Sequence, residues 1–275
     1  MGELLRIEHL SVTFSMYRYI LSRVESKGIE DLSISLYSGE ILAIVGASGS
    51  GKSLLAHAIM DLLPYNAIVR GDFYYQGEYV DGKRLERLRG TELSLIPQSI
   101  TYLDPTMKVG KQVIQEQFEM DQCKSIFAKL DLAEHVISLY PFQLSGGMAR
   151  RVLVSTALIS NASVIVADEP TPGMSVTDAV ETLQMLRQIA NEGKGCILIT
   201  HDLDLAIEVA DRVAVMYDGR IIDIVPAINF KRGVLTHPYT NALYRALPQN
   251  DFKSYTADEV ESFLRKGGNQ HVGSE

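Results

Sequence analysis

Short apolar runs of strand length alternate with amphipathic segments along much of the chain. Residues 41–45 and 164–167 are continuous apolar runs, a pattern typical of strands that are buried on both faces of a parallel sheet. The same pattern predicts strands at 93–96, 196–199 and 213–216, and helices at 54–63, 175–191 and 203–210. Because strands that alternate with helices form parallel βαβ units, the sequence predicts an α/β fold.

The amino-terminal part has a different period. Residues 4–14 mix apolar and polar positions and residues 32–36 alternate between them, which predicts a half-exposed antiparallel sheet. The segment 15–27 between them has no clear period and is predicted to be a loop. Other predicted elements are a strand at 71–75, a short helix at 83–89 and a hairpin turn at Asp218-Gly219.

The middle of the chain has a helical period. The spacing of Val113, Ile114, Gln117 and Phe118 predicts a helix within 109–130, and further helices are predicted at 133–139 and from 144 to about 160. We therefore predict a helical subdomain at about 98–155, inserted into the α/β part. Residues 227–275 become polar and charged toward their end, and their glycines predict a short, frayed tail.

The segment after the first buried run fits the phosphate-loop pattern G-x-x-x-x-G-K-[ST] at every fixed position. Backbone N–H groups of such a loop, at the start of a helix, form a site for phosphate oxygens. Lys52 is then expected to reach the β- and γ-phosphates, and the Ser53 hydroxyl to bind Mg²⁺. A plain Gly/Ser turn is the alternative, but the complete pattern between a strand and a helix favours a nucleotide site, formed by Gly46, Ala47, Ser48, Gly49, Ser50, Gly51, Lys52 and Ser53.

Two adjacent carboxylates follow the other buried run. Ligands of parallel sheets bind at the carboxyl ends of the strands, so Asp168 is expected beside the phosphates, where it can hold Mg²⁺. Glu169 is expected to face the γ-phosphate and to orient or deprotonate the attacking water. A solvated Asp-Glu turn is the alternative reading of this pair.

Composition and charge argue against several classes of partner, metal site and membrane segment. A formal net charge of −8 argues against broad binding of nucleic-acid backbones. Cys123 and Cys196 lack metal-ligand spacing, so neither a disulfide framework nor a metal cluster is predicted. The first residues lack a secretory signal, and no apolar run approaches the roughly eighteen residues that span a bilayer. We expect a cytoplasmic protein, which another chain would have to hold at a membrane.

Three further motifs follow in order: Gln98 after one predicted strand, the sequence LSGGM at 144–148, and Thr200-His201-Asp202 after another strand. With the phosphate loop and the Asp168-Glu169 pair, they resemble the ATP-binding cassette (ABC) ATPases over most of the chain. This resemblance implies a P-loop NTPase core of the RecA-like type, with an antiparallel β subdomain and a helical signature subdomain. It also implies an ATPase domain at 1–226 with a short tail at 227–275, and ATP and Mg²⁺ as cofactors.

The resemblance also implies roles for single residues. Two ATPase subunits of this family close head to tail, so Ser145, Gly146 and Gly147 are expected to cap an ATP held mainly by the partner. Gln98 is expected to touch Mg²⁺ or the attacking water, and His201 to contact the γ-phosphate and support Glu169. The aromatic residue that stacks on adenine is expected to be Phe14, with Tyr17 and Tyr19 as alternatives.

Several segments resemble the dipeptide, oligopeptide and nickel importers, most closely the first ATPase of nickel-type systems. They are Met148, residues 99–110, residues 140–142 and the segment 237–240. The resemblance implies an importer ATPase at the cytoplasmic face of the membrane. Its expected partners are a second ATPase in a heterodimer, two transmembrane permease subunits and, indirectly, an extracytoplasmic solute-binding protein. Nickel, another metal chelate and a peptide all remain open as the transported solute.

One position departs from the family pattern. Ser175 stands where the family has an aspartate that helps to couple the two ATP sites. This motivates an alternative hypothesis, in which the chain is mainly a regulatory ATP-binding subunit of an asymmetric pair. A third hypothesis is a soluble ABC ATPase that acts on nucleic acid or ribosomes, which the acidic balance disfavours.

Overall fold

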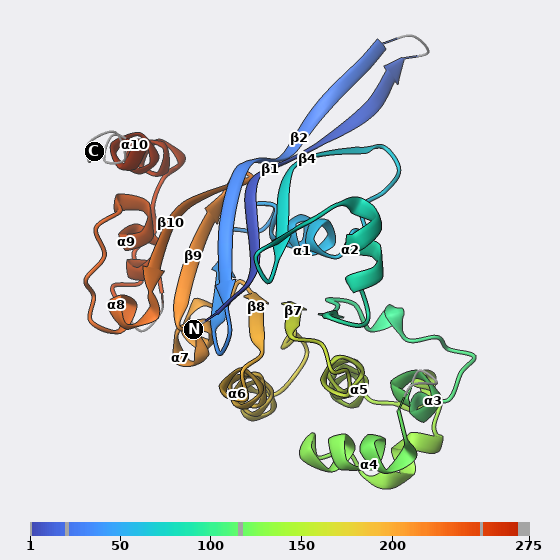
Figure 1. Cartoon of the computed structure of the whole chain (residues 1–275). Helices are drawn as coiled ribbons and strands as arrows, with labels where there is room; N and C mark the ends of the chain where they lie inside the picture. Colours follow the sequence, from blue (N-terminus) through green and yellow to red (C-terminus); the bar gives the residue numbers. More distant parts are fainter. Residues whose placement is uncertain (1, 20–21, 115–117, 248–249, 269–275) are drawn as a thin grey trace.

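Two sheets and a group of helices make up the fold (Figure 1). The computed structural model describes residues 2–19, 22–114, 118–247 and 250–268. In the antiparallel sheet the spatial order is β2 (Ser22–Tyr37), β1 (Glu3–Tyr19), β4 (Ala67–Tyr75) and β5 (Glu78–Val80). In the larger sheet it is β10 (Arg220–Pro226), β9 (Arg212–Tyr217), β3 (Ile41–Val45), β8 (Gly195–Ile199), β7 (Val164–Asp168) and β6 (Leu93–Ile96).

The larger sheet confirms the predicted parallel α/β core. β3 pairs in parallel with β8 on one side and β9 on the other, while β7 pairs in parallel with β8 and β6. All residues of β3, β7 and β8 are buried, as their continuous apolar runs predict. Because the strands are parallel, the loops that leave β3, β6, β7 and β8 emerge at one edge of the sheet.

Helices fill the space on both sides of this sheet. Leu42 and Ile44 of β3 pack in a core with the antiparallel sheet and α1 (Lys52–Ile59), whereas Ala43 and Val45 pack in a core with α7 (Leu203–Val209). A further core joins α5 (Gly146–Leu158) and α6 (Val176–Asn191) to the sheet. The short helix α2 (Gly82–Leu88) lies close to the predicted 83–89.

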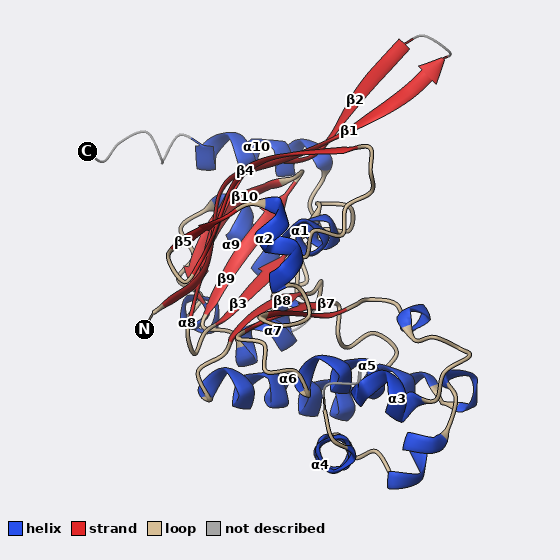
Figure 2. Ribbon diagram, turned by 45° about the vertical axis from the view of Figure 1, so that its right-hand side comes forward, coloured by secondary structure: helices blue, strands red, loops and turns tan. Residues whose placement is uncertain are grey.

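The helices α3 (Val109–Ile114), α4 (Met120–Lys129) and α5, here called the helical part, lie together beside the sheet (Figure 2). The helical period predicted within 109–130 corresponds to two separate helices, α3 and α4. Glu119 caps the start of α4, and its backbone N–H is bonded by the Gln122 side chain, which fixes a new helix start that periodicity does not reveal. Gln117 lies outside the described residues. The segment predicted at 133–139 is a 3₁₀ helix, Glu134–Ser138.

The prediction of a loop at 15–27 is wrong. β1 and β2 pair as a long antiparallel hairpin, from Thr13 opposite Lys27 to Tyr19 opposite Ser22, and this hairpin projects from the body of the molecule (Figure 1). Paired strands satisfy each other's backbone groups whether or not their side chains alternate in polarity. A hairpin that extends away from the core therefore has no reason to show the alternation that marks a half-buried strand.

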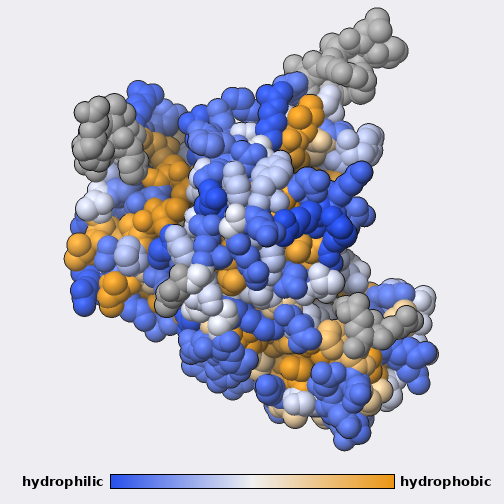
Figure 3. Space-filling view, viewed as in Figure 1, coloured by the Kyte–Doolittle hydropathy of each residue, from blue (hydrophilic) through white to orange (hydrophobic). Residues whose placement is uncertain are grey.

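The prediction of a frayed tail is also wrong for the described residues. Three helices follow β10, namely α8 (Ala227–Lys231), α9 (Pro238–Arg245) and α10 (Ala257–Gly268). Phe230 and Tyr239 are buried against β9, and hydrophobic surface lies beside β10 in the space-filling view (Figure 3). Gly267 is part of α10, and a Cβ atom at this position would lie 1.8 Å from the His237 ring. The glycine therefore allows α10 to pack closely against His237.

Two local predictions have different outcomes. Asp218 and Gly219 have φ angles of 45° and 77° and join β9 to β10, so the predicted hairpin turn is confirmed. The predicted helix 54–63 is displaced, because α1 begins at Lys52, directly at the phosphate loop, and ends at Ile59.

We expect Phe127→Ala to lower the free energy of unfolding by about 3–5 kcal/mol, because the ring is fully buried in the core of the helical part. Urea denaturation followed by circular dichroism measures the loss. Phe252→Ala is the control, since that ring is 74% exposed and its loss should change the free energy by less than about 0.5 kcal/mol. Equal effects of the two changes would contradict the assignment of this core.

Candidate functional site

A cleft of about 670 Å³ opens where the parallel strands end. The phosphate loop, the loops after β6, β7 and β8, and the turn after β9 contribute to its walls. The structure therefore brings together most of the residues predicted to serve one nucleotide. The cleft is lined by Lys27, Gly28, Ser48, Gly49, Gly51, Lys52, Ser53, Leu54, Gln98, Glu169, His201, Asp218 and Gly219.

The phosphate loop is shaped by close packing beneath it. A Cβ atom on Gly46 would lie 2.1 Å from the carbonyl oxygen of Met216, and Gly51 has a φ of 102°. Ser50 Oγ is buried without a hydrogen-bond partner among the described residues. These features leave glycine backbone and an unpaired hydroxyl at the loop, which suits the binding of phosphate oxygens.

Lys52 lies inside this loop. Its Nζ donates to the carbonyl oxygens of Gly46 at 2.9 Å and Ala47 at 3.0 Å. Burial lowers the pKa of Lys52, and the nearby carboxylates of Glu169 and Asp168 oppose that shift. A phosphate chain beside Nζ would favour the charged form of the amine in the same way as these carboxylates do.

Ser53 and Asp168 form an oxygen pair at the end of β7. Ser53 Oγ donates to Asp168 Oδ1 at 3.1 Å. Burial raises the pKa of Asp168, while the Ser53 hydrogen bond lowers it in part. A hydroxyl and a carboxylate are ligands that Mg²⁺ accepts, so the donor set fits the cation that the sequence predicts there.

Glu169 and His201 meet at the mouth of the cleft. Nδ1 of His201 lies 2.9 Å from each carboxylate oxygen of Glu169, in position to donate a hydrogen bond to the carboxylate. The Glu169 side chain is 8% exposed and that of His201 is 69% exposed. Glu169 has a φ of 49° and its N–H donates to the carbonyl of Ile199, so β8 holds this strained backbone in place.

Phe14, the predicted adenine contact, is not among the residues that line the cleft. Its partly buried ring packs against the core that includes the antiparallel sheet, next to Gly28 of the cleft wall. The side chains of Tyr17 and Tyr19 lie outside the described part. The structure adds Lys27 and Gly28 to the cleft, and both lie on β2, the strand that replaces the end of the predicted loop at 15–27.

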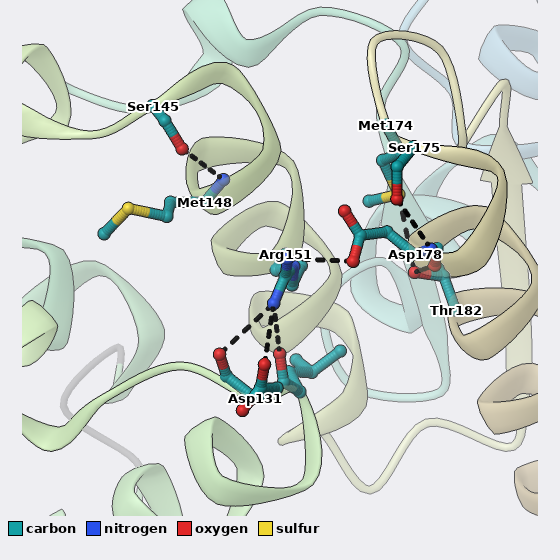
Figure 4. A network of polar contacts seen from close by, with 9 residues as sticks. Asp131, Ser145, Met148, Arg151, Met174, Ser175, Asp178 and Thr182 are labelled. Carbon is teal, nitrogen blue, oxygen red and sulfur yellow. Dashed lines mark hydrogen bonds and ion pairs between the residues drawn. The ribbon is translucent and has the colours of Figure 1, made fainter.

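The signature segment does not line this cleft. Ser145 caps α5 by accepting a hydrogen bond from the Met148 N–H at 3.2 Å (Figure 4). Apart from their chain neighbours and the backbone of their own helix, no described atom lies within 4 Å of the Cβ positions of Gly146 and Gly147, so the start of α5 is open to another molecule.

Arg150, which no sequence motif marks, connects α5 to the loop that enters the cleft. It is 5% exposed and donates from Nη1 to the carbonyl of Pro97 at 2.9 Å, next to Gln98. Burial lowers its pKa, and the carboxylates of Glu169 and Asp168 oppose the shift. An arginine within a helix is usually a surface residue, so sequence alone gives no signal for this contact.

The fold and the cleft define a P-loop nucleoside triphosphatase. The phosphate loop, the Ser53–Asp168 pair and the Glu169–His201 pair all lie at the same edge of the parallel sheet. Comparison with known proteins agrees. The chain is 35% identical over 265 residues to the oligopeptide transport ATP-binding protein OppD of Bacillus subtilis, with 89% of this chain and 72% of that protein covered. It is 34% identical over 271 residues to the glutathione import ATP-binding protein GsiA of Escherichia coli K12, covering 90% of this chain and 42% of that protein.

A solved dimer, the post-hydrolysis state of the ATP-binding cassette MJ0796 with ADP and Pi, aligns with a TM-score of 0.72 at 22% identity, over 82% of this chain and 99% of that one. This likeness confirms the predicted fold. The family described as ABC transporter matches residues 29–172. The chain belongs to the ABC transporter family, and it is an ATPase whose hydrolysis is coupled to transport. Within the described residues, no helix combines the length and the apolar character needed to cross a bilayer.

We expect Lys52→Ala to weaken ATP binding by roughly 10- to 100-fold, because charge-assisted hydrogen bonds contribute about 1.5–3 kcal/mol. Titration with a fluorescent ATP analogue measures the affinity. Lys194→Ala is a matched control, since Lys194 is another lysine whose pKa is lowered by burial, yet it donates to Ser160 and does not line the cleft. Unchanged affinity in the Lys52 variant would contradict the phosphate-loop assignment.

Proposed function

We propose that this chain is the ATP-hydrolysing subunit of an importer for short peptides, working at the cytoplasmic face of the membrane. The observation that carries the proposal is the convergence of the Ser53–Asp168 and Glu169–His201 pairs beside one phosphate loop. The substrate class is supported by relatives that are named for oligopeptide transport and glutathione import, since glutathione is itself a tripeptide. Nickel import finds no support in those names.

The residues of the cleft suit phosphoryl transfer to water. Loop N–H groups and Lys52 would neutralise the β- and γ-phosphates of ATP, and Mg²⁺ held by Ser53 and Asp168 would supply further charge stabilisation of the γ-phosphate. Glu169 would accept the proton of the attacking water. His201 would hold the Glu169 carboxylate in position through the Nδ1 hydrogen bond and approach the γ-phosphate. Gln98, which lines the same cleft, would orient that water or the cation.

A second ATPase subunit completes the proposed unit. The open backbone at Gly146 and Gly147 supports a role for the signature segment in binding an ATP on a partner, since, apart from chain neighbours and the backbone of their own helix, no described atom lies within 4 Å of their Cβ positions. Ser175 caps α6 by accepting from the Asp178 N–H at 3.1 Å, and it therefore keeps the capping function that an aspartate also performs while lacking the charge. This difference supports a heterodimer whose two sites are not equivalent.

A groove beside Gln98 supports the proposed contact with permease subunits. It has a volume of about 410 Å³ and runs between the sheet and the helical part, with Leu62, Pro97 and Leu153 in its walls. Tyr102 lines it and is 58% exposed, so its ring is accessible to another chain at this groove. Pro97 lines this groove and Gln98, the next residue, lines the ATP cleft. A permease helix bound in the groove would therefore move when ATP binding displaces Gln98. A solute-binding protein would act on the far side of the membrane.

We expect Glu169→Gln to slow ATP hydrolysis by about 10²- to 10⁴-fold while ATP still binds, because it removes the proton acceptor and preserves shape. The complex is purified from solubilised membranes through a tag on this chain, and its release of phosphate measures the rate. Glu92→Gln should leave the rate unchanged, since Glu92 bonds Tyr75 outside the cleft. Two multi-span subunits and a second ATPase should be recovered with the chain.

The same complex separates the two candidate roles. If the chain is mainly regulatory, as Ser175 suggests, Glu169→Gln here would leave turnover intact and the matching change in the partner ATPase would abolish it. Recovery of only non-membrane partners would instead argue against transport.

A further inference from the structure

Two consecutive arginines leave the signature helix α5 in different directions. Arg150 and Arg151 follow the segment 144–148 at the start of this helix. Each has a buried Nε without a hydrogen-bond partner among the described residues, while its terminal nitrogens donate to other segments. Burying a guanidinium is costly unless its contacts are well made, so these two positions are not ordinary surface charges.

Arg150 binds the loop that carries Gln98. Its Nη1 donates to the carbonyl oxygen of Pro97 at 2.9 Å, in a buried contact between residues 53 positions apart. Pro97 follows β6 directly and Gln98 lines the ATP cleft. The position of Gln98 is therefore linked to the position of α5.

Arg151 binds the segment that follows Glu169. Its Nη2 donates to Asp178 Oδ1 at 3.0 Å, and its Nη1 donates to the carbonyls of Leu130 and Asp131 at the end of α4 (Figure 4). Asp178 is in the first turn of α6, and Ser175 accepts its N–H. The Arg151 side chain is 18% exposed, so this ion pair is partly shielded from water.

Gln98 and Glu169 line the ATP cleft of this chain, so Arg150 contacts a loop of that site and Arg151 contacts α6, the helix that follows Glu169 along the chain. The start of α5 does not line that cleft. In the head-to-tail pair of the proposed function, the start of α5 covers the ATP of the partner. A movement of Gln98 or of the segment after Glu169 is then transmitted through one helix to the other site.

We propose that Arg150 and Arg151 are positioning residues that couple the two ATP sites of the dimer, by fixing α5 to the Gln98 loop and to the helix that follows Glu169 in its own chain. Arginine suits this task because its planar, always charged fork donates several hydrogen bonds at once. The inference rests on the proposed function, because it needs the head-to-tail pair.

The test measures ATP hydrolysis against ATP concentration in the tagged, membrane-derived complex. Wild type should be cooperative, with a Hill coefficient above about 1.5, as two coupled sites allow. Arg150→Met and Arg151→Met should each lower kcat by about tenfold and bring the Hill coefficient near about 1. Binding of a fluorescent ATP analogue to the full chain should change by less than about twofold, since neither arginine lines the cleft.

Arg150→Lys should recover more than half of kcat, because Arg150 makes one hydrogen bond that an ammonium group can also donate. Arg151→Lys should recover less, because a single ammonium group does not reproduce the fork that bonds α4 and α6 together. Arg151→Met combined with Asp178→Asn should be no worse than Arg151→Met alone, because the Asp178 side chain acts through its contact with Arg151. The control is Arg187→Met, which removes another ion pair of α6, with Asp211, that does not reach α5. It should leave the Hill coefficient unchanged whatever its effect on the melting temperature.

A complex that hydrolyses ATP cooperatively, and stays cooperative in folded Arg150→Met and Arg151→Met variants, would overturn this inference alone. Loss of cooperativity in Arg187→Met would also overturn it, because general destabilisation would then be the cause. A wild-type complex without ATPase activity would instead overturn the proposed function.

Discussion

The strand β3 pairs in parallel with β8 and β9, and its carboxyl end continues into the phosphate loop. The rest of the site depends on this pairing. It brings the loop after β8, with His201, to the same edge, and β7 adds Asp168 and Glu169 one strand further along. Neither carboxylate would face the loop if β7 ran in the opposite direction, because its ends would be exchanged. A buried parallel sheet therefore sets the geometry of the chemistry before any polar contact forms.

Charge is concentrated at this edge at a cost in stability. Burial lowers the pKa of Lys52 and raises that of Asp168, and each shift favours a neutral group that the chemistry cannot use. Glu169 adds backbone strain of about 1–3 kcal/mol at its positive φ. ATP bound at a concentration of 100 times its Kd would offset about 2.7 kcal/mol of such costs, because it binds only the folded state. The site is arranged to be most stable when it holds its substrate.

Local chemistry explains which features the sequence predicts well. The phosphate loop and the Asp168-Glu169 pair are defined by the local order of residues, so the sequence predicts most residues of the cleft. A continuous apolar run indicates burial on both faces of a strand, so the sequence also predicts the core strands. The hairpin at 15–27 is not predicted, because strand pairing away from the core leaves no alternation. The resemblance alone predicts that Phe14 stacks on adenine, and no local pattern indicates that its partly buried ring packs against the core next to Gly28. The contact from Arg150 to Pro97 depends on a fold that spans 53 positions, which no local pattern contains.

Buried arginines also bear on how the helical part is attached to the sheet. The core around Phe127 holds α4, α5 and residues of the sheet together through apolar contacts that are non-directional. Such contacts keep the helices packed but do not fix which loops follow them. The hydrogen bonds of Arg150 and Arg151 are directional, and each ends on a loop of the ATP site or on the helix that follows one. Apolar packing thus makes the helical part a unit, and the two guanidinium groups determine which movements of the ATP site that unit transmits.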